Sequence, residues 1–195
     1  MMFRFKSRTY QQLSDEKLTI FISNGDVAAF NELYNRYNER ILYYFYRMLW
    51  NDKELAQDFL QDLFMKIIDK LNTFNTDRKF STWVFSIAHN MCKNEYRKRQ
   101  IRALAALEPD VACDAFDDET AVYSALQIED VFDCLNDLDE LHRTAFLLKY
   151  REGLSIEAIG AVLDLPVGTV KSRLFYTRKK IQKDLIRKLQ ICQDC

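Results

Sequence analysis

Apolar residues recur every three to four positions through most of the chain, which is the spacing of an α-helix that buries one face. We find no convincing run in which apolar and polar residues alternate, as they do along a half-buried β-strand. The chain of 195 residues has only 4 glycines and 2 prolines, so long helices with few turns are expected. The pattern predicts an all-α protein, and it contains no internal repeat.

Two long helices are predicted in the first part of the chain. Asp26 follows Asn24 and Gly25 and offers a capping side chain, so one helix is predicted to begin there. Its apolar face comprises Phe30, Leu33, Tyr34, Tyr37, Ile41, Leu42 and Phe45. The second helix, residues 54–71, is predicted to bury Leu55, Phe59, Leu63, Ile67 and Leu71. Its polar residues stand on a different face and include Asp58, Gln61, Asp62 and Lys66.

A loop over residues 72–80 is predicted to lead into a helix that starts apolar and aromatic and ends basic. Such a helix can anchor its start in a core and extend its basic end along a phosphate backbone. Trp83 lies near this start, where a core position and a base-stacking position are equally compatible with the pattern.

Residues 155–180 have the pattern of a helix-turn-helix. Ser155 can cap a short helix, Asp164 can adopt the left-handed conformation of a tight turn, and Pro166 can start the next helix. Gly160 is expected to let the two helices cross closely. The second helix of such a motif enters the major groove of DNA.

A helical wheel separates three sets of residues on this second helix. The buried stripe is predicted to comprise Val167, Val170, Leu174, Thr177, Ile181 and Leu185. Ser172, Phe175, Tyr176, Lys179 and Lys183 point the opposite way. Lys171 and Arg178 flank one edge of the stripe, and Arg173 and Lys180 flank the other. The flanking cations would neutralise phosphates while the outward set faces base edges.

Charge divides the chain in the same way. The net charge is -1, but residues 103–142 contain twelve acids and no Lys or Arg, whereas both flanking segments are basic. We therefore predict two small helical domains, residues 1–102 and 128–195, joined by an acidic linker over residues 103–127. The linker could be a solvated tether, or it could contact a partner, and the sequence supports both interpretations.

Catalytic and metal-binding chemistry is not indicated. The chain has no Gly-rich phosphate loop and no HExxH motif. Cys192 and Cys195 form a CxxC without the second pair that a zinc site needs. We expect no cofactor, no metal, no small-molecule substrate and no catalytic residue. No apolar run approaches the length of a membrane span, so neither membrane insertion nor secretion is expected and a cytoplasmic protein is predicted.

Four segments together resemble a known family. They are DVAAFNELYNRY, LAQDFLQDLFMKI, FSTWVFSIAHNMCKNEYRKR and EGLSIEAIGAVLDLPVGTVKSRLFYTRKKI. In this order and spacing they resemble the extracytoplasmic-function (ECF) sigma factors, the minimal two-domain class of specificity subunits of bacterial RNA polymerase. The resemblance covers about three quarters of the chain. Single motifs of this kind are weak signals, because similar recognition helices occur in other regulators, but four in order are specific.

The resemblance implies a role for each region. The residues that match the contact with the clamp coiled coil of core RNA polymerase are Asp58, Gln61 and Asp62. Those that match recognition and melting of the -10 element are Asn75, Asp77, Arg78, Lys79, Trp83, Asn90, Lys93 and Arg97. Those that match recognition of the -35 element are Thr169, Lys171, Ser172, Arg173, Phe175, Tyr176, Arg178 and Lys179.

Partners and departures from the family pattern also follow from the resemblance. It implies core polymerase, promoter DNA and an anti-sigma factor as partners. Gln57 replaces a usual Glu in the clamp contact, which removes one negative charge. Asp139 replaces a usual Pro, Gly160 a usual Ala and Asp164 a usual Gly, and none of these removes a DNA-facing group.

Two other classes of protein compete with this interpretation. A stand-alone helix-turn-helix regulator would explain the C-terminal motif, although it leaves the separate basic helix and its loop without a role. A purely protein-binding helical adaptor would use the acidic segment and leave the basic faces solvated.

Overall fold

The computed structural model describes residues 10–106, 131 and 133–191, and within these ranges it contains helices and no β-strand. This confirms the all-α prediction. The chain divides into two compact units, residues 1–89 and 90–195, and one long helix contributes to both. The acidic part of the predicted linker and the cysteines Cys113, Cys192 and Cys195 lie outside the described residues.

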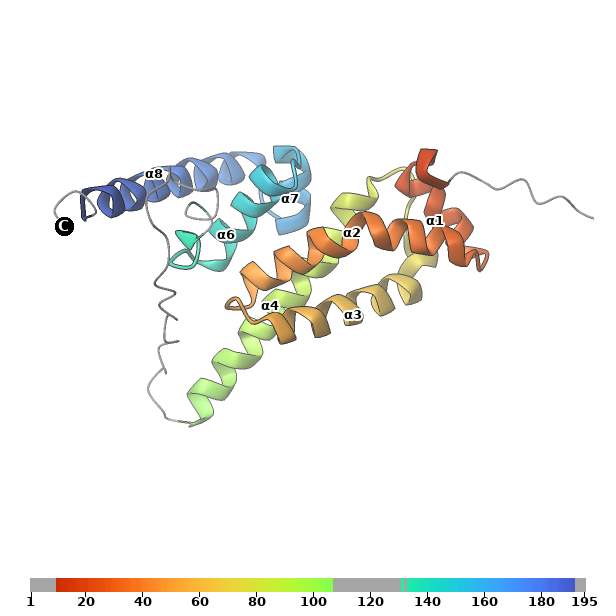
Figure 1. Ribbon diagram of the computed structural model, residues 1–195, viewed down its shortest axis with the longest axis horizontal. Helices are drawn as coiled ribbons and strands as arrows, with labels where there is room; N and C mark the ends of the chain where they lie inside the picture. Colours follow the sequence, from red (N-terminus) through yellow and green to blue (C-terminus); the bar gives the residue numbers. More distant parts are fainter. Residues whose placement is uncertain (1–9, 107–130, 132, 192–195) are drawn as a thin grey trace, which may run out of the picture. The chain divides into compact units, whose positions relative to one another are not determined.

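Helices succeed one another through both units (Figure 1). The part up to the long shared helix comprises η1 (Tyr10–Gln12), α1 (Asp15–Ser23), α2 (Val27–Met48), α3 (Lys53–Lys70), η2 (Leu71–Thr73) and α4 (Phe80–Ala106). The later part comprises α6 (Glu140–Phe146), a π-helical turn η3 (Leu147–Arg151), α7 (Ile156–Leu163) and α8 (Val167–Ile191).

Helix α2 begins where its cap predicts. The Asp26 carboxylate accepts hydrogen bonds from the N–H groups of Ala28 and Ala29, at 3.0 and 3.1 Å. Helix α1 was not predicted, although its signal is present in the sequence. Ser14 caps it through the Lys17 N–H at 3.3 Å, and two acids follow in its first turn, where the helix dipole favours them.

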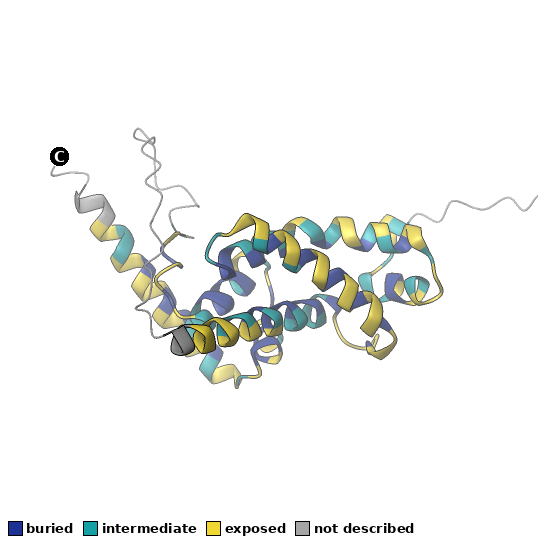
Figure 2. Cartoon of the chain, turned by 90° about the horizontal axis from the view of Figure 1, so that it is seen from below, coloured by how far each residue is buried: buried dark blue, intermediate teal, exposed yellow. Residues whose placement is uncertain are grey.

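The core of the first unit lies where α2 packs against α1 and α3. Leu18, Leu33, Ile41, Phe45 and Leu63 are fully buried there, and Figure 2 shows buried residues on the inner sides of helices whose outer sides are exposed. The prediction for α3 is confirmed at Leu63, Ile67 and Leu71, which are buried, but the buried face differs toward the start of the helix. This face comprises Ala56, Leu60, Leu63, Phe64 and Ile67. Leu55 and Phe59 are only half-buried. The side of α3 that meets α2 is centred on Ala56, Leu60 and Leu63 instead.

Arg36 fastens the start of the chain to α2. Its guanidinium donates hydrogen bonds to Asp15 at 2.7 Å, to Glu32 at 2.8 Å and to three backbone carbonyls within residues 10–13. Tyr37 adds a hydrogen bond from its hydroxyl to the other Asp15 oxygen, at 2.5 Å. Burial and the Asp15 carboxylate raise the Tyr37 pKa, so the phenol stays protonated and remains a donor.

In the second unit, two side chains fix the entry into α6. Asp139 caps the helix by accepting from the N–H groups of Leu141 and His142, both at 3.1 Å. Arg143, which is almost fully buried, donates to carbonyls of the preceding turn, including that of Leu138 at 3.0 Å. The buried cation therefore donates three hydrogen bonds to backbone carbonyls, in keeping with the need of a buried charge for partners.

The helix-turn-helix is present as α7, a short turn and α8. Ser155 caps α7 through the Ala158 N–H at 3.1 Å, and Asp164 has the left-handed conformation, with φ 55° and ψ 48°. Both predictions are confirmed. The prediction for Gly160 is wrong in one respect. A Cβ there would lie 2.8 Å from the Leu165 carbonyl, so the missing side chain makes room for the turn rather than for a second helix.

Candidate polymerase and nucleic-acid interfaces

One exposed face of α3 carries the residues expected to contact polymerase. Asp58, Gln61 and Asp62 are all exposed, and their spacing of three and four residues places them on one side of the helix. Within the described part of the chain, no ion pair neutralises either acid. Met65 extends this face by one turn and is 62% exposed. The surface is therefore acidic with one apolar residue at its end, and it takes no part in the core.

The loop before α4 has a fixed shape at its start. The Asn75 side-chain oxygen accepts from the Asp77 N–H at 2.9 Å, and the Asn75 carbonyl accepts from the Arg78 N–H at 3.0 Å. This is an Asx-turn, so Asn75 shapes the loop as well as lying on its surface. Asp77, Arg78 and Lys79 are exposed beyond it. Two cations are thus presented next to the first residue of α4.

Aromatic rings anchor the two ends of this loop. Phe74 and Phe80 are buried and pack edge to face, with ring centroids 5.7 Å apart. Trp83 contacts both of them, at 5.0 and 5.6 Å, and is half-buried. Trp83 is thus neither a fully buried core residue nor a fully exposed one. Part of its ring belongs to the aromatic cluster, and part is accessible.

Three further polar residues follow Trp83 along α4. Asn90, Lys93 and Arg97 lie 7, 10 and 14 positions beyond it, which keeps them on the same side of a helix, and all three are exposed. The loop positions 75–79 and these three positions of α4 are exposed, and the half-buried Trp83 lies between them along the chain. Cations therefore lie on both sides of Trp83 along the chain, Arg78 and Lys79 before it and Lys93 and Arg97 after it.

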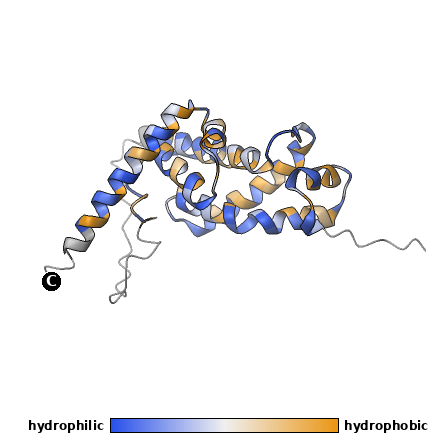
Figure 3. Cartoon of the chain, turned by 90° about the horizontal axis from the view of Figure 1, so that it is seen from above, coloured by the Kyte–Doolittle hydropathy of each residue, from blue (hydrophilic) through white to orange (hydrophobic). Residues whose placement is uncertain are grey.

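Helix α8 presents a second exposed surface. Ser172, Phe175, Tyr176 and Lys179 are all exposed, with Phe175 at 54% and Tyr176 at 63%. Val170, Leu174, Thr177 and Ile181 are buried on the opposite side. Figure 3 shows hydrophobic and hydrophilic residues as separate patches along the helix that leads to the C-terminus. The wheel is confirmed except at the two ends of the predicted stripe. Val167 is 37% exposed because it occupies the first position of α8, before the core begins, and Leu185 is only half-buried.

The cations beside the buried stripe are not equivalent. Lys171 and Arg178 are exposed, whereas Arg173 is half-buried and its Nη1 lies 3.9 Å from an Asp139 oxygen and 3.5 Å from His142 Nδ1. Lys180 donates to the Asp137 carbonyl at 2.6 Å. One edge of α8 is therefore free for a ligand, and the other is tied to the segment that enters α6.

Asp139 contacts both Arg173 of α8 and His142 of α6. Burial tends to raise its pKa, but hydrogen bonds from the backbone and ring of His142, together with the nearby Arg173 charge, outweigh burial and hold the pKa below its ordinary value. The carboxylate is ionised at neutral pH and continues to attract both neighbours.

At the start of α8, Thr169 is half-buried, and its N–H donates a hydrogen bond to the Pro166 carbonyl at 2.9 Å.

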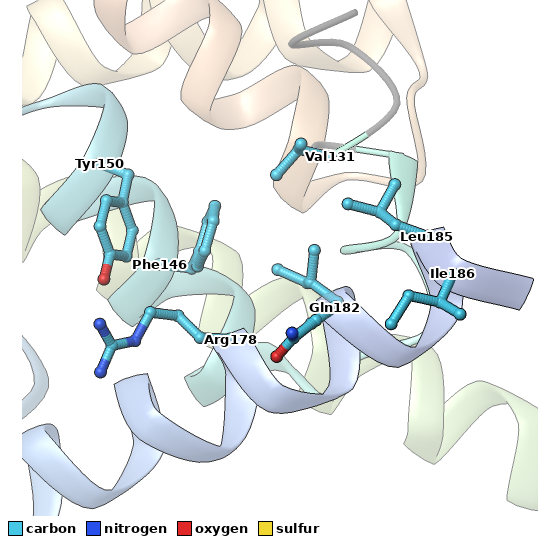
Figure 4. Close-up of a pocket in the computed structure, with 8 residues that line it drawn as sticks. Val131, Phe146, Tyr150, Arg178, Gln182, Leu185 and Ile186 are labelled. Carbon is cyan, nitrogen blue, oxygen red and sulfur yellow. The ribbon is translucent and has the colours of Figure 1, made fainter. Parts of the chain in front are cut away.

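An apolar groove on the second unit was not predicted from the sequence. It has a volume of about 450 Å³ and is lined by Phe146 and Tyr150 on one side and by residues of α8 on the other (Figure 4). Ile186, on the α8 side, is 48% exposed. The wheel could not identify this groove, because it forms only where the end of α6 meets the middle of α8.

Comparison with known proteins finds two matching domains in the chain. Residues 33–102 match the family model of Sigma-70 region 2, and residues 128–181 match that of Sigma-70, region 4. The ECF RNA polymerase sigma factor SigW of Bacillus subtilis is 32% identical, over 84% of this chain and 92% of its own. The ECF RNA polymerase sigma-E factor of Escherichia coli K12 is 32% identical, over 88% and 94%.

Solved structures give the same result. CnrH, in complex with the cytosolic domain of CnrY, is 25% identical with a TM-score of 0.66, over 89% of this chain and 97% of its own. The sigma factor RpoE of Bartonella quintana, in complex with the anti-sigma factor NepR, is 28% identical with a TM-score of 0.62, over 74% and 89%. The chain belongs to the ECF family of RNA polymerase sigma factors, which direct promoter-specific transcription initiation.

Proposed function

We propose that the chain performs its sigma-factor function through three separate surfaces. The α3 face binds the clamp coiled coil of core polymerase, the loop and stripe of α4 take the -10 element as single strands, and the outward face of α8 reads the -35 element. The observation that carries this proposal is that most residues of each set are exposed, either in the loop before α4 or on helices whose opposite sides are buried. We assign the first two roles to residues 1–102 and the third role to residues 128–195, with residues 103–127 as the acidic linker.

The -10 surface suits unpaired DNA. A ring such as Trp83 can stack with any base, and the cations at Arg78, Lys79, Lys93 and Arg97 can follow a phosphate backbone. Asn75, Asp77 and Asn90 add polar side chains next to these cations in the sequence. A base that leaves the duplex loses its stacking on neighbouring bases. Stacking on the aromatic cluster can replace part of that lost interaction.

The -35 surface suits a duplex. An α-helix fits the major groove, where Ser172, Phe175, Tyr176 and Lys179 would face base edges. Lys171 and Arg178 would contact phosphates, while Thr169 lies at the start of the helix. Arg173 belongs to the same proposed set, but its contact with Asp139 gives it a second role in holding α8.

Two weak DNA surfaces become effective when polymerase holds them at a fixed spacing. Once one element is bound, binding of the second is intramolecular and occurs at a high effective concentration. The free chain should therefore bind promoter DNA poorly. It needs no catalytic residue and no cofactor, because polymerase performs the chemistry, and its place of action is the cytoplasm, where polymerase works.

Control by an anti-sigma factor is part of the proposal. Both structural relatives described above were solved in complexes, RpoE with an anti-sigma factor and CnrH with the cytosolic domain of CnrY. The exposed helix faces offer surfaces for a helical partner. Affinity purification of the chain from uninduced cells should recover such a protein. Recovery of none would favour control by the level of expression.

The polymerase contact can be tested directly. Reversal of the two acids in Asp58→Lys/Asp62→Lys should abolish binding to core polymerase and leave the fold intact, because both side chains are exposed. Glu39→Lys, an exposed charge reversal on α2, serves as the control. Unchanged affinity of the double variant in a titration would exclude this surface. Binding of core polymerase by the unaltered chain also separates the sigma factor from a stand-alone regulator or an adaptor.

Promoter use needs a second experiment. Run-off transcription on genomic fragments, with core polymerase and the full chain, should give discrete start sites that disappear when the chain is omitted. A product pattern that does not depend on the chain would contradict the proposed function.

A further inference from the structure

The start of α4 lacks a local cap. Lys79 occupies the capping position, since its carbonyl accepts the first helical hydrogen bond, from the Trp83 N–H at 3.2 Å. A lysine side chain has donors and no acceptor, so it cannot satisfy the free N–H groups of the first turn. The preferred capping residues are Ser, Thr, Asp and Asn. An acceptor for this helix start must therefore come from elsewhere in the chain.

Glu16 supplies that acceptor. The Phe80 N–H, the first of α4, donates to Glu16 Oε1 at 3.2 Å across 64 positions of sequence. The carboxylate also lies at the positive end of the α4 dipole, where a negative charge is favourable. Through the Glu16 side chain, helix α1 therefore contacts the chain where the loop ends and α4 begins.

The surroundings of Glu16 agree with this contact. Burial tends to raise the pKa of Glu16, but hydrogen bonds from its own N–H and from that of Phe80, a bond from Ser14 and the nearby Lys79 charge hold the pKa below its ordinary value. The side chain is therefore ionised at neutral pH. Because Lys79 is close enough to contribute, Glu16 acts on a cation of the candidate -10 surface as well as on the backbone beside it.

The neighbouring residue secures α1 itself. Asp15 accepts from Arg36 and from Tyr37, and the Tyr37 ring packs edge to face on Phe80, with centroids 5.2 Å apart. Asp15 fastens α1 to α2, and Glu16 is then directed at the first turn of α4. The two adjacent acids have different partners, so α1 is attached both to α2 and to the start of α4.

We propose that Glu16 is a positioning residue for the -10 surface, a cap supplied by α1 that fixes the loop of residues 74–79 and the first turn of α4 for capture of single-stranded DNA. This inference rests on the proposed role of the loop. Glu16 itself makes no contact with DNA. Its effect is to keep Lys79 and Trp83 in place.

The test uses the full chain assembled with core polymerase and a fluorescent single-stranded oligonucleotide that carries the -10 sequence found by run-off mapping. Glu16→Ala removes acceptor and charge, and about fivefold weaker binding is expected from the loss of one helix cap. Glu16→Gln keeps an acceptor oxygen, so it should restore binding to within about twofold of the unaltered chain. Glu39→Ala is the matched control for loss of one surface acid.

Two companion measurements separate positioning from general stability. Affinity for core polymerase should be the same in all variants, and hydrogen exchange in Glu16→Ala should accelerate at the first amides of α4 and not across α2. Unchanged oligonucleotide binding by Glu16→Ala would overturn the proposal, and so would a parallel loss of polymerase affinity. Trp83→Ala tests the underlying function independently. If it also leaves oligonucleotide binding unchanged, the assignment of the loop fails, whatever Glu16 does.

Discussion

The two candidate DNA surfaces are held in place in different ways. In the first unit, the loop and the start of α4 depend on Glu16 and Tyr37, which earlier helices contribute, and on the packing of Phe74 against Phe80 at the two ends of the loop. In the second unit, α8 is oriented mainly by its own buried stripe, with an additional tie from Arg173 to Asp139. The first surface is therefore assembled from distant parts of the sequence, whereas the second is largely specified within one helix.

This difference has a functional consequence. A surface that must melt DNA and accept a displaced base needs a loop, and a loop needs external support to keep one shape. A surface that reads a duplex needs only a rigid helix with one face free. Changes far from the DNA should thus weaken the first surface, while the second should be lost only through its core or its contact residues.

The largest expected effect tests the internal support of α8. Val170→Asp places a charge at a position with no exposure, so it should destabilise the second unit by about 4 kcal/mol or more. Thermal unfolding followed by circular dichroism should show early loss of part of the helical signal. Phe175→Asp is the control, since that side chain is exposed and its replacement should leave the melting temperature nearly unchanged. Similar destabilisation by both would contradict the assigned orientation of α8.

The same contrast explains what the sequence could predict. The stripe of α8, the cap of α7 and the left-handed Asp164 depend on residues a few positions apart, and the sequence predicted them correctly. Val167 and Leu185 were predicted wrongly, because a helical wheel carries no information about where the core begins and ends. The groove beside Phe146 was missed because it requires two helices to be placed against each other.

The hydrophobic periodicity of the sequence could not predict contacts between residues far apart in the chain. Nothing in the spacing of Glu16 and Phe80 connects them, and the buried Arg143 gives no periodic signal. Helix α1 is a different case. Ser14 followed by two acids is a local starting signal that could have identified it.

The second prediction concerns the external support of the first unit. Arg36→Ala removes several charge-assisted hydrogen bonds that attach η1 and α1 to α2, and it should lower the stability of the first unit by about 3 kcal/mol. Chemical denaturation monitored by tryptophan fluorescence measures the change, because Trp50 and Trp83 both belong to this unit. Arg78→Ala provides the comparison, as an exposed cation in the loop whose loss should cost little. If both variants unfold alike, the attachment is not a main source of stability.

The third prediction separates base reading from phosphate contact on α8. Replacement of Ser172, Phe175, Tyr176 or Lys179 should cost roughly 1 to 3 kcal/mol on the preferred -35 sequence and less on altered sequences. Lys171→Ala or Arg178→Ala should weaken all sequences alike and reduce the salt slope by about 1. The measurement is binding of the polymerase complex to a panel of -35 variants at two salt concentrations.

Arg173 gives that panel an internal check. Its contacts with Asp139 and His142 predict that Arg173→Ala lowers the stability of the second unit in addition to any loss of DNA affinity, whereas Lys171→Ala leaves stability unchanged. If the outward set and the flanking set have the same effect on every sequence, α8 does not read bases in this orientation.

The smallest effect tests how local the specification of the second unit is. Asp164 adopts φ 55°, which is costly for a residue with a Cβ, although Asp tolerates it better than most. Asp164→Gly relieves that strain but gives the unfolded chain more freedom, so a net gain of roughly 0.5 kcal/mol is expected. Asp164→Ala should instead destabilise, because Ala keeps a Cβ and loses the polar group. Melting temperatures measure both changes. Because the turn only joins α7 to α8, the preference among -35 sequences should stay the same in both variants, and a shift in that preference would mean that the turn itself helps to place α8 in the groove.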